Sequence, residues 1–90
     1  MKYRDKIAII QDILQTARSD GNGAVKTQLM YKAFLSSYQI RDYLSILVDN
    51  DLLQCDLDSR RFKITEKGIR FLQLCDRIGG LVQEEASAPI

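Results

Sequence analysis

The sequence lacks histidine altogether and has only two cysteines and one proline among its 90 residues. Without histidine, neither a serine–histidine–aspartate triad nor a histidine general base can form. Two cysteines cannot supply the four Cys and His ligands of a structural zinc site. No apolar run approaches the roughly 20 residues that a membrane-spanning helix needs. We therefore expect no enzymatic activity, no cofactor, no metal, no small-molecule substrate and no membrane partner.

The few remaining reactive groups also favour a simple binding domain. Gly21-Asn22-Gly23 lacks the spacing of a phosphate-binding glycine loop and is interpreted as a turn. Cys55 and Cys75 stand among apolar neighbours, so buried free thiols are favoured over the alternative of a disulfide between them. The charged start of the chain, Met1–Asp5, leads into helical periodicity rather than a secretory signal, which favours a cytoplasmic location.

A complete helix start lies near the middle of the chain. Ser36 is placed to cap a helix, and Gln39 three residues later completes a capping box. Leu35 can pack against Ile40 as a hydrophobic staple across the same turn. We expect this helix to end at Asn50.

Two strands and a further capped helix follow in the sequence. Leu52–Cys55 and Arg61–Ile64 predict a short hairpin around the polar turn Asp56–Arg60. Thr65 then caps a last helix, expected over about residues 66–82. Capped helix, hairpin and capped helix form the second half of a winged helix-turn-helix, a mainly helical α+β fold that most often contacts DNA. We expect one domain over residues 1–83 and a flexible tail over 84–90.

The first third of the chain supplies the rest of such a domain. Asp5–Ser19 predicts a helix, Ala24–Lys26 a short extended link that can lie against the hairpin, and Thr27 the cap of a helix over Gln28–Phe34. The first helix carries an apolar stripe formed by Ile7, Ile10, Leu14 and Ala17, with Ile9 and Ile13 beside it. The second helix offers the core Leu29, Met30, Ala33 and Phe34. The short connection to the next helix predicts a steep crossing, as in a helix-turn-helix.

The predicted third helix has two different faces. Its apolar face carries Ile40, Tyr43, Leu44 and Leu47. Its polar face carries Tyr38, Arg41, Asp42, Ser45 and Asp49, with Gln39 at the edge. Such a face is typical of any amphipathic surface helix, but its place after the tight turn favours a surface that contacts DNA bases.

The net charge of +1 argues against strong nonspecific binding to nucleic acid, but the cations are clustered. The hairpin and last helix carry Arg60, Arg61, Lys63, Lys67, Arg70 and Arg77. This cluster is either an ordinary solvated face or a phosphate-binding wing. The last helix also has a wide apolar belt formed by Phe71, Leu72, Leu74, Cys75, Ile78, Leu81 and Val82. We expect a homodimer through Leu74, Ile78, Leu81 and Val82, with Gly79-Gly80 either ending or kinking the helix or allowing close helix contact.

Four ordered segments resemble the archaeal 10a-type small winged-helix DNA-binding proteins and related archaeal regulators. These segments are Lys26-Thr27-Gln28-Leu29-Met30-Tyr31, Leu35-Ser36-Ser37-Tyr38, Tyr43-Leu44-Ser45-Ile46-Leu47-Val48 and Phe62-Lys63-Ile64-Thr65-Glu66-Lys67-Gly68. The resemblance implies a homodimer joined by an antiparallel coiled coil of the last helix. It also implies binding to double-stranded DNA as a chromatin-associated or regulatory protein.

The sequence thus predicts a dimeric, sequence-selective DNA-binding protein. The expected DNA contacts are Thr27, Lys32, Ser37, Tyr38, Gln39, Arg41, Ser45, Arg60, Arg61 and Lys63. Arg41 is the expected base reader, because a guanidinium can bond two acceptors on guanine. The alternative is a winged-helix module for protein–protein contact that does not bind DNA, which the low net charge favours.

Overall fold

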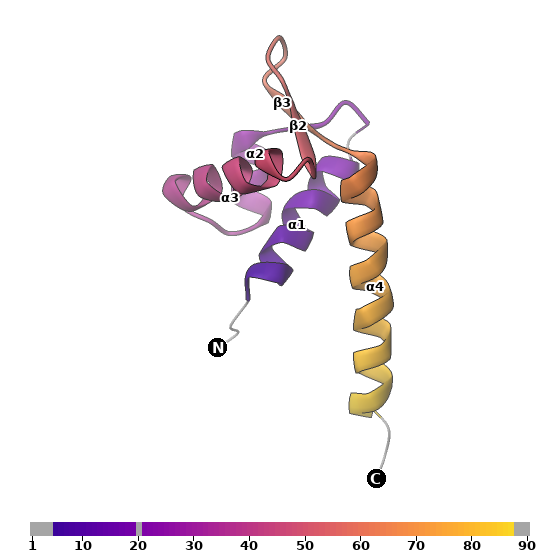
Figure 1. Cartoon of the computed structure of the whole chain (residues 1–90). Coiled ribbons are helices and arrows are strands. Elements are labelled where there is room, and N and C mark those ends of the chain that lie inside the picture. The colour runs from indigo at the N-terminus through magenta and orange to yellow at the C-terminus, as the bar shows by residue number, and fades with distance from the viewer. Residues whose placement is uncertain (1–4, 20, 88–90) are drawn as a thin grey trace.

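A computed structural model describes residues 5–19 and 21–87, with side chains described as far as residue 77 (Figure 1). The described elements are α1 (Lys6–Ser19), β1 (Ala24–Val25), α2 (Lys26–Lys32), α3 (Ser37–Asp49), β2 (Leu53–Asp56), β3 (Arg61–Ile64) and α4 (Glu66–Ser87). Helices α1, α2 and α3 form the body, the β2–β3 hairpin projects from it, and α4 leaves along one side. This arrangement confirms the predicted winged helix-turn-helix.

The sheet places β3 in the centre, in the order β1-β3-β2 with both pairings antiparallel. Ala24 pairs with Phe62, so the short link lies against the hairpin as predicted. Strand β2 begins at Leu53, one residue later than expected, because the Leu52 N–H donates to the Leu47 carbonyl oxygen at 2.9 Å and closes the end of α3. The helix end and the strand start therefore share one tight turn.

The core is formed by residues from every helix and from the sheet. Its fully buried large side chains are Ile13, Leu14, Leu29, Ile40, Leu47, Leu53 and Leu72. One part of the predicted α1 stripe is wrong, because Ile7 is 50% exposed whereas Ile13 is completely buried. Ile7 lies in the first turn of α1, and the buried residues of that helix are concentrated in its second half.

Helix α2 differs from the prediction at both ends. It begins at Lys26, and Val25 rather than Thr27 occupies the N-cap, without a side-chain hydrogen bond. Val25 pairs with Arg61 across the sheet, so strand pairing fixes the helix start and Thr27 is inside the helix. The helix ends at Lys32, and Phe34, expected in the core, is 84% exposed.

The turn after α2 holds Phe34 in the left-handed conformation, with a φ of 57°. The Leu35 N–H donates to the Met30 carbonyl oxygen at 3.0 Å, which is the hydrogen bond of a Schellman ending. Glycine is usual at such a position, because the left-handed conformation costs other residues about 1–2 kcal/mol. A phenylalanine is therefore strained there while burying little of its ring.

Helix α4 begins as predicted, with the Gly68 N–H donating to the Thr65 hydroxyl oxygen at 3.0 Å. It packs against α1 and then extends beyond the body (Figure 1). The helix continues through Gly79-Gly80 to Ser87, five residues past the expected end at 82. Leucine, glutamine, glutamate and alanine after the glycines favour helix and offset their cost of about 1 kcal/mol each. No helix in the described part of the chain is long and apolar enough to cross a membrane.

Candidate nucleic-acid interface

The N-terminus of α3 is fixed by the predicted capping box. The Gln39 N–H donates to the Ser36 hydroxyl oxygen at 3.2 Å, and the Ser36 N–H donates to Gln39 Oε1 at 2.9 Å. This reciprocal pair holds the first turn without help from the rest of the fold. Gln39 thereby uses its side-chain carbonyl internally and presents only its amide NH₂ for a further contact.

The two faces of α3 also match the prediction. Ile40, Leu44 and Leu47 are buried and fix the rotation of the helix about its axis. The opposite side exposes Ser37, Tyr38, Gln39, Arg41, Asp42 and Ser45. The Arg41 guanidinium lies 6.0 Å from the centre of the Tyr38 ring, at the outer limit of a cation–π contact. Five of the predicted DNA contacts are therefore brought together on one exposed helix face.

The wing is a tight and internally bonded turn. The Arg60 N–H donates to the Asp56 carbonyl oxygen at 2.7 Å, and the Asp58 N–H donates to Asp56 Oδ1 at 3.0 Å. The Asp58 N–H and the Ser59 hydroxyl and N–H lower the pKa of the Asp56 carboxyl below its ordinary value. Arg60 occupies the left-handed region with a φ of 56° and exposes its side chain at the end of this turn.

The other two wing cations are partly used inside the protein. Arg61 is half-buried, and its Nη1 donates to the Gly23 carbonyl oxygen at 3.0 Å. Arg61, one of the expected DNA contacts, is therefore partly used inside the protein, because β1 covers this edge of β3. Lys63 is exposed, with its Nζ 3.9 Å from the Asp56 carboxylate. Arg60 and Lys63 thus present the outward positive charge of the wing.

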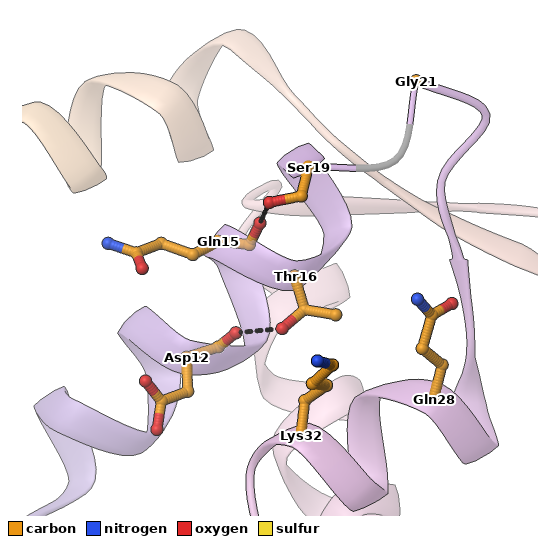
Figure 2. A pocket seen from close by; sticks show the side chains of 7 residues that line it. All are labelled: Asp12, Gln15, Thr16, Ser19, Gly21, Gln28 and Lys32. Atoms are coloured by element: carbon orange, nitrogen blue, oxygen red, sulfur yellow. Dashed lines mark hydrogen bonds between the residues drawn. The ribbon is translucent and has the colours of Figure 1, made fainter.

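Both predicted contacts on α2, Thr27 and Lys32, are exposed. Lys32 lies in an open polar cleft of about 590 Å³ between α1, α2 and the loop that joins them (Figure 2). The cleft is lined by Asp12, Gln15, Thr16, Ser19, Gly21, Gln28 and Lys32. Its two hydroxyls are turned onto their own helix, since Thr16 donates to the Asp12 carbonyl oxygen and Ser19 to that of Gln15, both at 2.8 Å. Lys32 thus borders α1 and the loop that follows it.

Neither cysteine forms a disulfide, as the sequence favoured. Both are half-buried, and burial raises the pKa of the Cys75 thiol. Among the described residues, no group of His, Cys, Asp and Glu side chains is arranged to hold a metal ion. Within the predicted dimer surface, Leu74 is 52% exposed, while the side chains of Ile78, Leu81 and Val82 lie outside the described residues.

The structure exposes three large residues near α3 that the sequence did not assign to the interface. Tyr31 is 69% exposed and Phe34 is 84% exposed at the end of α2, and Ile46 is 51% exposed on α3 itself. Apolar periodicity alone places Phe34 on the core side of a continuous helix. The early end of α2 at Lys32 turns it outward instead.

A family model described as winged helix-turn-helix matches residues 3–83 of the chain. Among solved structures, the chain is similar to Sso10a-2, described as a DNA-binding protein from Sulfolobus solfataricus, with a TM-score of 0.77 and 23% sequence identity. That similarity covers 93% of this chain and 87% of the Sso10a-2 chain. No curated protein matches the sequence. The match over most of the chain and the shared architecture show that the protein belongs to the winged helix-turn-helix family.

Proposed function

We propose that the protein binds double-stranded DNA as a homodimer, with α3 in the major groove and the wing on the phosphate backbone. The observation that carries this proposal is the exposed polar face of α3, held in one orientation by the capping box and by three buried side chains. A helix in a major groove must present hydrogen-bonding groups in a fixed geometry to distinguish base pairs. The similarity to Sso10a-2, described as DNA-binding, supports the same assignment.

The contacts divide into base reading and phosphate binding. Arg41 is the proposed base reader, with Ser37, Tyr38 and Ser45 beside it and the Gln39 amide NH₂ as an additional donor. Arg60 and Lys63 bind phosphates from the wing, and Thr27 and Lys32 flank the helix as further backbone contacts. Arg61 contributes charge while its bond to Gly23 positions the wing against β1. Sequence selectivity suits this arrangement better than bulk DNA compaction, because the net charge is only +1.

A regulatory role follows from selective binding by a dimer. Two copies related by a two-fold axis would present two α3 helices to successive major grooves of a palindromic site. The extension of α4 beyond the body and the exposed Leu74 support this helix as the contact between copies. We therefore propose a transcriptional regulator or a chromatin-associated protein with the same DNA-binding mode.

The direct test is binding to duplex DNA over a range of salt concentrations. Phosphate contacts release counterions, so about four to eight contacts per dimer predict a log–log slope near −4 to −7. Gel-shift titrations of the purified protein measure this slope, and selection from random duplexes shows whether a palindrome is enriched. An absence of duplex binding in low salt would overturn the proposal.

A second candidate is a winged-helix module for protein–protein contact. The net charge of +1 and the exposed apolar side chains of Phe34, Ile46 and Leu74 favour it. The same duplex selection separates the two functions, because a protein-contact module retains no DNA. Helix α3 would then serve as an ordinary solvated surface.

A further inference from the structure

An apolar side chain lies on the exposed surface of α3. Ile46 is 51% exposed, although three other apolar side chains of the same helix are buried. Ile46 lies four residues after Asp42 and seven after Gln39, so these three positions share one side of the helix. Asp42 and Gln39 are exposed as well. Ile46 is therefore part of the surface that the proposed function places in the major groove.

Folding accounts for only part of the choice of isoleucine at position 46. Half of this residue remains in water, so burial gives it less than a core position would. Its β-branched side chain also favours helix less than alanine, glutamate or lysine does. A single exposed isoleucine is ordinary on a protein surface, and its meaning depends on the groups around it.

The three positions carry three different kinds of recognition chemistry. Gln39 presents its amide NH₂ as a donor, because its Oε1 accepts the Ser36 N–H at 2.9 Å. The Asp42 carboxylate can only accept hydrogen bonds, and Ile46 can make only apolar contacts. Base edges in the major groove present acceptors, amino donors and, on thymine alone, a methyl group at C5. The apolar position of this surface thus matches the one apolar group in the groove.

The charge on either side of Ile46 favours base edges over the DNA backbone. Asp42 and Asp49, four residues before and three residues after Ile46, are both exposed. Two carboxylates on this side of the helix would repel phosphates. A carboxylate can instead accept a hydrogen bond from the amino group of cytosine. This side of α3 therefore suits the floor of the groove.

We propose that Ile46 recognises thymine in the major groove by packing against its C5 methyl group. This inference rests on the proposed function, because the contact requires α3 to lie in the groove of a duplex. It names a specificity determinant that the polar contacts of α3 do not supply, since hydrogen-bonding groups do not detect a methyl group. A homodimer on a palindrome would make the contact once in each half-site.

Replacement of thymine by uracil tests the contact, because uracil lacks only the C5 methyl group and keeps the same hydrogen-bonding groups. The substrate is the tightest duplex recovered by selection, with uracil placed at one thymine position of both half-sites at a time. At one position the wild type should lose affinity about fourfold per half-site, which corresponds to ~0.8 kcal/mol for one buried methyl-sized group. Gel-shift titrations measure the ratio of the two dissociation constants.

The decisive variant is Ile46→Ala, which removes the proposed partner of the methyl group. It should bind the thymine and uracil duplexes with equal affinity, within about twofold of the wild type on the uracil duplex. Any effect of uracil on the shape of the duplex acts on both proteins alike and cancels in this comparison. Ile46→Val keeps a branched side chain and should retain part of the preference for thymine. Urea unfolding checks that both variants are folded under the binding conditions.

The matched control is Leu57→Ala in the wing loop, because Leu57 is also apolar and is 85% exposed. This variant removes an exposed apolar side chain of similar size outside α3. It should keep the wild-type preference for thymine over uracil at the same position.

Equal binding of the thymine and uracil duplexes by the wild type overturns the inference and leaves duplex binding intact. A preference for thymine that survives in Ile46→Ala also overturns it, because another group then detects the methyl. A wild type that binds no duplex overturns the inference together with the proposed function. Weaker self-association of Ile46→Ala in sedimentation, without a thymine preference in the wild type, would assign Ile46 to protein contact instead.

Discussion

The Thr65 hydroxyl donates to the Asp51 carbonyl oxygen, and the same oxygen atom of Thr65 accepts the Gly68 N–H at 3.0 Å. One side chain therefore caps α4 and attaches its first turn to the end of α3. The Thr65 N–H adds a bond of 3.2 Å to the Leu52 carbonyl oxygen in the same turn. The orientation of α3 is thus coupled to the helix that extends away from the body.

Replacing Thr65 with valine should destabilise the protein by about 1–2 kcal/mol, because the isosteric side chain can neither cap α4 nor bond to Asp51. Urea unfolding measures the change in the free energy of unfolding. The slope of that free energy against urea concentration should be unchanged. Thr65→Ser keeps the hydroxyl and should recover most of the loss. If the valine variant matches the wild type, the hydroxyl does not join the two helices.

The helix starts at Ser36 and Thr65 could be predicted from sequence because their bonds join residues three positions apart. The cap predicted at Thr27 was wrong, because β1 pairing with the distant Arg61 sets the start of α2 and leaves Thr27 inside the helix. The same distance effect explains the half-buried Arg61, whose partner Gly23 is 38 residues away in sequence. Local sequence signals thus predicted which helices and strands form, whereas contacts between residues distant in sequence decide how individual side chains such as Arg61 are placed.

Gly68→Ala should destabilise the protein although alanine favours helix by about 1 kcal/mol. An added Cβ would collide with the Leu52 carbonyl oxygen and lie 2.7 Å from Ile64 Cγ1. Overpacking of this kind costs about 1–3 kcal/mol, more than the gain in propensity. Gly21→Ala is the control, because its Cβ meets nothing within 4 Å. Thermal or urea unfolding of both variants should show loss only for Gly68→Ala.

Base reading and phosphate binding should separate in two variants. Arg41→Ala should cost about 1–3 kcal/mol on the preferred duplex and reduce discrimination among sites. Arg60→Ala should weaken binding to all duplexes alike and lower the salt slope by about 1. The stability of the protein should change little, because arginine and alanine meet the same energetic cost in the left-handed conformation. Competition gel shifts on matched and mutated sites measure both. If Arg41→Ala keeps affinity and selectivity, α3 is not the reader.

The candidate site was only partly accessible to sequence reasoning. The exposed face of α3 follows from helical periodicity, since Arg41 and Ser45 lie one turn apart and opposite Ile40 and Leu47. The outward turn of Phe34 depends instead on where α2 ends. Periodicity does not contain that information.

The turn of the wing should respond to acid. The pKa of the Asp56 carboxyl is lowered below 3.8, mainly by the Asp58 N–H, so the folded turn favours the charged form. The stability that the bond to the Asp58 N–H contributes is therefore fully present above the unfolded pKa. It is lost as the pH falls through the lower folded value. The Asp58 amide resonance should shift with a midpoint below 3.8. Asp56→Asn should remove that transition, and a midpoint at or above the ordinary value would contradict the hydrogen bond.

The homodimer should depend on the face of α4 that carries Leu74. About 400 Å² of apolar surface per chain would contribute about 10 kcal/mol at roughly 25 cal/mol per Å². The entropy lost on association offsets much of this contribution. A micromolar dimer, with an association free energy near −8 kcal/mol, needs only part of it. Leu74→Asp places a charge in that contact and should shift the protein to monomer in sedimentation equilibrium. Ile78→Asp, one turn further along the helix, should act in the same way.

Gln73→Asp is the matched control, because Gln73 is exposed on the same helix and the change adds the same negative charge next to position 74. It should leave the dimer intact if one face of α4 forms the contact. Equal dissociation by both variants would indicate a general charge effect. A wild type that stays monomeric at tens of micromolar, a concentration at which a micromolar dimer is mostly assembled, would remove the dimer and with it the paired α3 helices of the proposed DNA site.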